Sequence, residues 1–250
     1  MKQQKNTMQH PGVTFMLALF ILICLSSPVI GGLIEDMVVL DRSYIPALAL
    51  TNQPDKPAGA VVESMRRLNS AWPLFIRSLS KADRESPVLA QAVSVAGAKI
   101  QEANRLVAAG KRKDAHEALE TVRNAFWKAR AAMNIQYLPD LMTAFHEPME
   151  HFYDLVVRPG SNPKDLAALL EELSARWADV EKTRPDPKLF GLNEEQVGRY
   201  TVLVKKEREI LTKLSGILRT GNAEAISKTA GSMKGTFAQA YLVFGDFSGL

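Results

Sequence analysis

The chain has 250 residues, of which 46% are hydrophobic and only 7% aromatic, enough for one large or two small domains with aliphatic cores. Its formal net charge is +4, and without residues 1–31 the balance is 29 basic against 27 acidic residues. This near neutrality argues against nucleic acid as a partner, because nucleic-acid-binding proteins concentrate positive charge on one surface.

The N-terminus has the pattern of a secretory signal peptide. A basic start precedes a charge-free apolar run over residues 13–25, and small residues follow Pro28, so we expect cleavage before Gly32. The alternative is an uncleaved anchor, since residues 13–34 are long enough to span a bilayer and would be the only membrane contact. Both interpretations predict export, either to the periplasm or as an inner-membrane-anchored protein that faces it. The exported part has no cysteine, because Cys24 lies in the apolar run.

Apolar side chains after residue 34 recur every three or four positions, the spacing of amphipathic helices, and no stretch alternates with a period of two. Asn193 and Gln196 form a capping box, and Gly110 and Gly221 fit the ends of helices. The expected helices are 34–52, 58–80, 86–109, 111–134, 138–158, 163–182, 193–219 and 222–247.

The predicted helices divide into two related units. The pattern Leu-x-x-x-Trp occurs at 68–72 and again at 173–177, and the glycine before the last helix of each unit also aligns. Short connections make sequential helices antiparallel neighbours. We therefore predict an all-α fold of two tandem, internally duplicated, up-down antiparallel four-helix bundles, with unit 1 at residues 32–135 and unit 2 at residues 136–250. The sequence is compatible both with two separate bundles and with one merged array of helices.

Two segments resemble the soluble cytochrome b562 family of four-helix bundles. Residues 63–69 are similar to the start of that family's first helix, and residues 109–115 to the turn into its last helix. In that family a methionine and a histidine hold the haem iron, and the resemblance places Met65 at the methionine position. The histidine position falls on Arg130, and on Tyr241 in unit 2. The resemblance thus implies the fold and argues against family-type haem binding.

Histidines and carboxylates gather in the middle of the chain. The candidate metal ligands are His116, Glu120, His146, Glu150 and His151. Helical spacing makes His146 and Glu150 neighbours, and antiparallel pairing about residue 136 brings Glu120 level with His151. Imidazole and carboxylate groups in this arrangement suit a divalent metal ion. The alternative is ordinary ion pairs, because His116 and His146 lie at the edges of their apolar stripes, whereas metal ligands in bundles point inward.

Two further residues stand out by their position. Glu207 lies close to the apolar stripe of the helix expected at 193–219, where a carboxylate needs a partner. Trp127 falls on the polar side of its helix, so we expect it to pack between the two units or to meet a partner.

The sequence contains no glycine-rich phosphate loop, nucleophile elbow or Ser/His/Asp arrangement, so we expect no enzyme. The leading hypothesis is an exported, non-catalytic helical-bundle protein that binds a protein partner or a small ligand. The alternative is a metal- or b-haem-binding bundle, in electron transfer or metal handling, that uses His116, His146 and His151. A sensor domain is a third hypothesis, but residues 241–250 are too short for a second membrane span.

Overall fold

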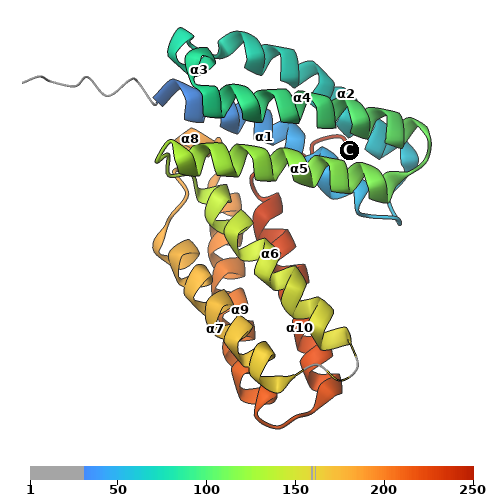
Figure 1. Ribbon diagram of the computed structural model, residues 1–250, viewed down its shortest axis with the longest axis vertical. Helices are drawn as coiled ribbons and strands as arrows, with labels where there is room; N and C mark the ends of the chain where they lie inside the picture. Colours follow the sequence, from blue (N-terminus) through green and yellow to red (C-terminus); the bar gives the residue numbers. More distant parts are fainter. Residues whose placement is uncertain (1–30, 159, 161) are drawn as a thin grey trace, which may run out of the picture.

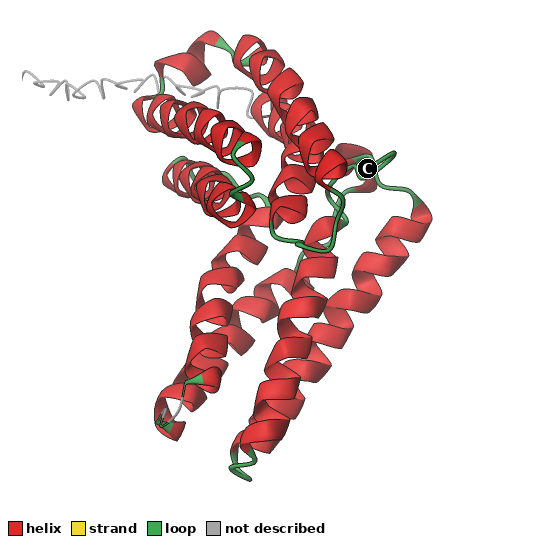
Figure 2. Ribbon diagram, turned by 90° about the vertical axis from the view of Figure 1, so that its right-hand side faces the viewer, coloured by secondary structure: helices red, strands yellow, loops and turns green. Residues whose placement is uncertain are grey.

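The computed structural model describes residues 31–158, 160 and 162–250, and every regular element in them is a helix (Figures 1 and 2). The helices are α1 (Gly31–Thr51), α2 (Ala58–Ser78), α3 (Lys81–Glu85), α4 (Pro87–Ala108), α5 (Arg112–Ala132), α6 (Leu138–Val157), α7 (Pro163–Lys182), α8 (Pro187–Phe190), α9 (Glu194–Leu218) and α10 (Ala223–Leu242). The predicted all-α fold is confirmed. The proposed signal peptide lies outside the described residues apart from Gly31, and of the alternative anchor only residues 31–34 are described, at the start of α1. None of the described helices is both long and apolar enough to cross a bilayer.

In each half of the chain, four long helices form a bundle in which every helix packs against two neighbours, so that they form a closed ring. In unit 1, α1 and α4 each pack against both α2 and α5. In unit 2, α6 and α9 each pack against both α7 and α10. Both rings have the up-down order that short connections impose. The long axes of the two rings cross steeply, so the molecule is two bundles and not one merged array (Figure 1).

The helices begin and end at the local signals that the sequence carries. Ser86 accepts a backbone hydrogen bond at the start of α4, and Asn193 and Gln196 form the predicted capping box of α9. Gly110 and Gly221 follow α4 and α9 with φ values of +73° and +68°, which glycine adopts without strain. The sequence did not reveal the short helices α3 and α8. Each follows the second long helix of its unit, so the two units share this feature as well.

The two repeated tryptophans have different environments. Trp177 is completely buried, and its Nε1 donates to the carbonyl of Val204 at 3.0 Å. Trp72 is half-buried and contacts the rings of Phe75 and Phe126. Trp177 therefore anchors the core of unit 2, whereas Trp72 packs at the edge of the core of unit 1.

A buried ion pair joins the two units. Arg130 of α5 donates to both carboxylate oxygens of Asp140 in α6, at 2.7 and 2.6 Å, and its guanidinium lies 4.6 Å from the ring centre of Tyr137. The Tyr137 hydroxyl donates to Asp41 of α1 at 2.7 Å. Burial raises the pKa of Asp41 to about 6, against the opposing charge of Arg130. Arg130, at the position that the resemblance assigns to a haem ligand, thus makes a contact between the units.

The last helix is shorter than predicted, because α10 ends at Leu242 and does not continue to residue 247. The residues that follow turn back onto α1, where the backbone N–H of Asp246 donates to the carbonyl of Arg42 at 2.9 Å. The two side chains also form an ion pair at 3.4 Å. Gly245 lies so close to α1 that a Cβ atom there would be 2.9 Å from a side-chain methyl carbon. The C-terminal segment, residues 243–250, therefore does not continue α10 but packs against α1 and connects unit 2 to unit 1.

Candidate functional site

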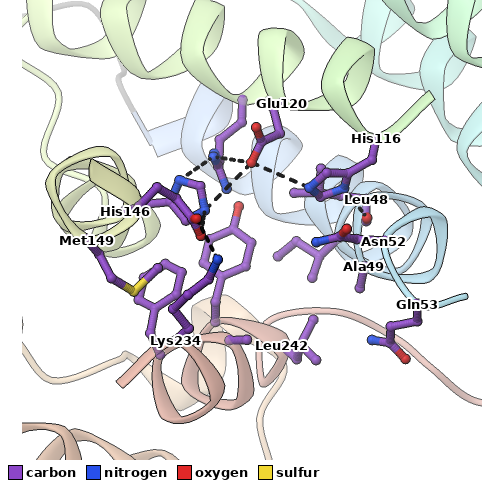
Figure 3. A pocket seen from close by; sticks show the side chains of 16 residues that line it. Leu48, Ala49, Asn52, Gln53, His116, Glu120, His146, Met149, Lys234 and Leu242 are labelled. Atoms are coloured by element: carbon purple, nitrogen blue, oxygen red, sulfur yellow. Dashed lines mark hydrogen bonds and ion pairs between the residues drawn. The ribbon is translucent and has the colours of Figure 1, made fainter. Parts of the chain in front are cut away.

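A pocket of about 220 Å³ opens at the junction of the two units, where α1 and α5 face α6 and α10 (Figure 3). Its apolar lining includes Ile45, Leu48, Met149, Phe237 and Leu242. Its charged and polar lining includes His116, Glu120, Arg123, His146, Glu150 and Lys234. An apolar wall with a few convergent polar groups at a domain boundary is the usual form of a small-molecule site.

Four of the five predicted metal ligands meet in this pocket. His116 and Glu120 come from α5, and His146 and Glu150 come from α6. The fifth, His151, is exposed and does not line the pocket. The prediction that Glu120 lies level with His151 is wrong, because α5 and α6 belong to different bundles and cross. Oε1 of Glu120 instead lies 3.6 Å from Nε2 of His146.

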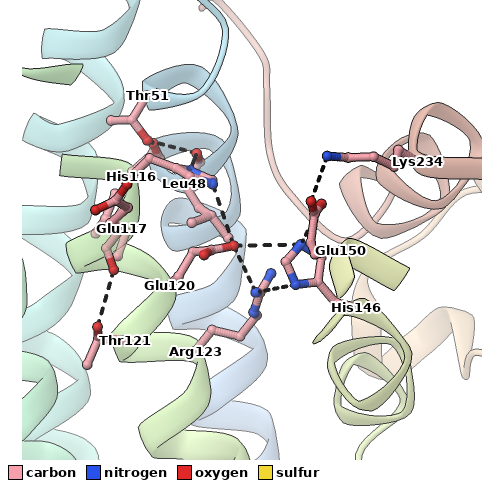
Figure 4. A network of polar contacts seen from close by, with 12 residues as sticks. Leu48, Thr51, His116, Glu117, Glu120, Thr121, Arg123, His146, Glu150 and Lys234 are labelled. Atoms are coloured by element: carbon pink, nitrogen blue, oxygen red, sulfur yellow. Dashed lines mark hydrogen bonds and ion pairs between the residues drawn. The ribbon is translucent and has the colours of Figure 1, made fainter. Parts of the chain in front are cut away.

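Arg123 is the central residue of the polar network, although it was not among the predicted site residues (Figure 4). Its Nη2 donates to Oε1 of Glu120 at 3.0 Å and to Nδ1 of His146 at 2.9 Å. A guanidinium can only donate, so Nδ1 of His146 accepts and the ring proton lies on Nε2. One feature of the sequence could have pointed to Arg123. Arg123 and Arg130 are seven residues apart, which places both arginines on one face of α5 beside its apolar stripe.

The protonation states in the network follow from burial and from the arginine. Burial and the charge of Arg123 lower the pKa of His146 to about 3, so its imidazole is neutral at physiological pH. Burial alone would raise the pKa of Glu120, but the hydrogen bond with His116 and the charge of Arg123 outweigh it and lower this pKa to about 2. An ionised carboxylate therefore lies beside a neutral imidazole.

His116 and Lys234 connect the network to the helices on either side. Nδ1 of His116 lies 2.8 Å from the carbonyl oxygen of Leu48 and donates to it, which satisfies a carbonyl in the last turn of α1. Nε2 of the same ring lies 3.5 Å from Oε1 of Glu120. Across the pocket, Nζ of Lys234 in α10 donates to Oε2 of Glu150 at 2.6 Å. The pocket thus draws on α1, α5, α6 and α10 together.

The donor set does not fit a metal ion as it is arranged. In the described part of the chain, no group of three or more His, Cys, Asp or Glu side chains is placed to hold one. Arg123 occupies Nδ1 of His146 and one oxygen of Glu120, and Lys234 occupies one oxygen of Glu150. Arg123 and Lys234 would therefore compete with a metal ion for these three atoms. Metal and haem binding stay predictions.

The two other residues that the sequence singled out lie away from this pocket. Glu207 is completely buried in unit 2, and neither carboxylate oxygen has a hydrogen-bond partner among the described residues. Burial raises the pKa of Glu207 to about 9. Trp127 is half-buried and lines a second, open groove of about 550 Å³ between the units, together with Tyr137 and Phe190. Trp127 thus lies at the boundary of the two units, and whether it meets a partner stays a prediction.

The comparisons with known proteins add no further identification. No protein-family model matches the chain, and neither a curated protein nor a solved structure shows significant similarity to it. The resemblance to the cytochrome b562 family therefore stays a prediction. The pocket between the units is the feature from which a function has to be argued.

Proposed function

We propose that the protein is an exported, non-catalytic binding protein that holds a small organic molecule in the pocket between its two units. The observation that carries this proposal is the pocket itself, whose apolar wall and charged groups come from both bundles. A molecule in this position contacts α1 and α5 on one side and α6 and α10 on the other. Its binding energy would therefore add to the contacts that hold the units together.

The electrostatics of the pocket support binding over catalysis. A general acid or base works best when its pKa is close to the operating pH. Glu120 and His146 have pKa values of about 2 and 3, so neither exchanges protons readily near neutral pH. Arg123 and Lys234 each form an ion pair with a carboxylate of the chain, which holds their positive charges in place. These groups are suited to holding a ligand in a fixed electrostatic environment.

Native mass spectrometry of protein purified from the exported fraction of its host tests the proposal. Ala238 lies exposed at the rim of the pocket, so Ala238→Trp would obstruct the pocket without disturbing a core. Ala98 is exposed on α4 and outside the pocket, so Ala98→Trp is the matched control. We expect a bound molecule on the wild type and on the control that is absent from Ala238→Trp.

Two results would decide against this function. The same bound molecules on all three proteins, or none on the wild type, would show that the pocket is not a binding site. Elemental analysis of the same preparations covers the alternative function. Stoichiometric zinc, copper or iron in the wild type that is lost in His146→Ala would favour a metal-binding protein.

A further inference from the structure

The chemical class of the ligand can be inferred from the hydrogen-bonding capacity that the pocket leaves unused; this inference rests on the proposed function. Arg123 is only 7% exposed and makes its hydrogen bonds through Nη2. Its hydrogen bonds to described residues use neither Nη1 nor Nε, and Nε is completely buried without a partner among them. A buried guanidinium with unused donors is unfavourable unless another acceptor meets it.

Lys234 supplies a second group with donors to spare. Its ammonium group has three donors, of which one is used by Glu150 at 2.6 Å. The same nitrogen lies 4.4 Å from the ring centre of Tyr153, and the side chain is 34% exposed. Figure 3 shows Lys234 extending from α10 into the pocket, opposite His116 and Glu120 of α5.

The carboxylates of the pocket already face cationic or imidazole groups of the chain. Oε1 of Glu120 faces Arg123, His116 and His146, at 3.0, 3.5 and 3.6 Å. The two oxygens of Glu150 face Lys234 and His146. A ligand with a positive charge would meet Arg123 and Lys234, which already neutralise these carboxylates. A ligand with a negative group would meet donors that lack an acceptor.

We propose that the ligand carries a carboxylate, which binds between Arg123 and Lys234, and a small apolar body, which packs against Leu48, Met149 and Phe237. Carboxylates are the usual partners of guanidinium groups, and their hydrogen bonds are charge-assisted. A volume of about 220 Å³ is below the range of about 300–1,000 Å³ typical of drug-sized ligands, so the apolar body is small. Simple carboxylic acids and apolar amino acids share this chemistry.

Isothermal titration with four probes that share one apolar body tests the inference on the full exported chain. The probes are 4-methylpentanoate, L-leucine, 4-methylpentanamide and 3-methylbutan-1-amine. We expect 4-methylpentanoate to bind at least about tenfold more tightly than the amide and the amine, the ratio given by one charge-assisted hydrogen bond. Leucine that binds more tightly than 4-methylpentanoate identifies an amino acid as the natural type of ligand. Weaker binding of leucine identifies a simple carboxylic acid.

A pair of lysine variants supplies the matched control. Lys234→Met keeps the length of the side chain and removes its charge, and we expect the affinity for 4-methylpentanoate to fall about tenfold. Lys228 is exposed on the same helix and does not line the pocket, so Lys228→Met should leave the affinity unchanged. Lys234 is preferable to Arg123 as the test position, because Arg123 is buried between the units and its replacement endangers folding.

Several results would overturn the carboxylate assignment. These are tighter binding of the amine or the amide, an unchanged affinity in Lys234→Met, or no binding of any of the four probes. The proposed function is judged separately, by whether a co-purifying molecule disappears in Ala238→Trp. A bound molecule without a carboxylate that disappears in this way would leave the function standing and remove only the ligand class.

Discussion

Glu207 offers a direct measurement of how much one buried group affects the stability of unit 2. The side chain lies in α9, completely buried, with no hydrogen-bond partner for either oxygen among the described residues. Burial raises its pKa from 4.5 to about 9. At neutral pH it is therefore protonated in the folded protein and ionised in the unfolded chain. We expect Glu207→Gln to stabilise the protein, because glutamine has nearly the same shape and cannot ionise.

The size of the effect follows from the two pKa values. Between pH 4.5 and about 9 the unfolded chain has lost the Glu207 proton and the folded protein has kept it, so the free energy of unfolding falls by about 1.4 kcal/mol per pH unit. At pH 7 the accumulated loss is about 3 kcal/mol. Protonated Glu207 and glutamine both bury unpartnered polar groups of similar size, so these costs largely cancel. The variant should gain about 3 kcal/mol at pH 7 and almost nothing near pH 4.5.

Urea unfolding followed by circular dichroism at several pH values measures this difference. Glu209 is exposed on the same helix, so Glu209→Gln controls for the loss of one negative charge. The gain of Glu207→Gln over the wild type should grow steadily from about pH 5 to about pH 8.5. A difference that does not change with pH, or a variant that is less stable at every pH, would refute the reasoning. A difference that does not change with pH would mean that the pKa of Glu207 is not raised in the folded protein, and a uniform loss would mean that the buried amide costs more than the buried carboxyl group.

Three further predictions concern the junction of the two units. The pKa of His146 is lowered from 6.5 to about 3, so the unfolded chain binds a proton that the folded protein does not. The free energy of unfolding should therefore fall by about 1.4 kcal/mol for each pH unit below 6.5. In thermal unfolding, His146→Gln should depend less steeply on pH in this acidic range than the wild type does. Asp140→Ala leaves Arg130 buried without its partner and should lower the free energy of unfolding in urea by about 3–5 kcal/mol. Asp179→Ala is the control, because it breaks an exposed pair with Lys182 and should cost less than about 1 kcal/mol. Gly245→Ala places a Cβ within 3.0 Å of α1 and should lower the free energy of unfolding by about 1–3 kcal/mol. Gly198→Ala is the control, because this helical position is open, and it should raise the free energy of unfolding by up to about 1 kcal/mol. Equal losses at the two aspartates, or equal effects at the two glycines, would contradict these assignments.

Most helices were predictable because their signals are local. The apolar spacing predicted a helix over 138–158, and the helix runs over Leu138–Val157. The short helices escaped prediction because they depend on single capping residues and carry too few apolar positions for a period to appear. Ser80 caps α3 through a capping box, and Asp186 accepts two backbone hydrogen bonds at the start of α8. The end of α10 was not predictable, since it is set by contacts with α1, far away in sequence.

The candidate site was predictable only in part, for a related reason. His146 and Glu150 are neighbours on one helix, and this follows from helical spacing alone. Which residues of α5 face them depends on how the two bundles cross, and this crossing brought in Glu120 and Arg123 and left His151 in solvent. Lys234 reaches Glu150 from 84 residues away, a pairing for which the sequence carried no signal.

The sequence by itself determined that the chain is helical, that its helices fall into two matching sets of four, and where most of them begin and end. These properties depend on contacts within a few residues, which a period of 3.6 and a cap express directly. The tertiary structure decided which faces of the helices pack against each other at the junction of the two units. That choice depends on the crossing of two bundles held by the Arg130–Asp140 ion pair and the C-terminal segment, and contacts between distant residues leave no periodic pattern in a single chain.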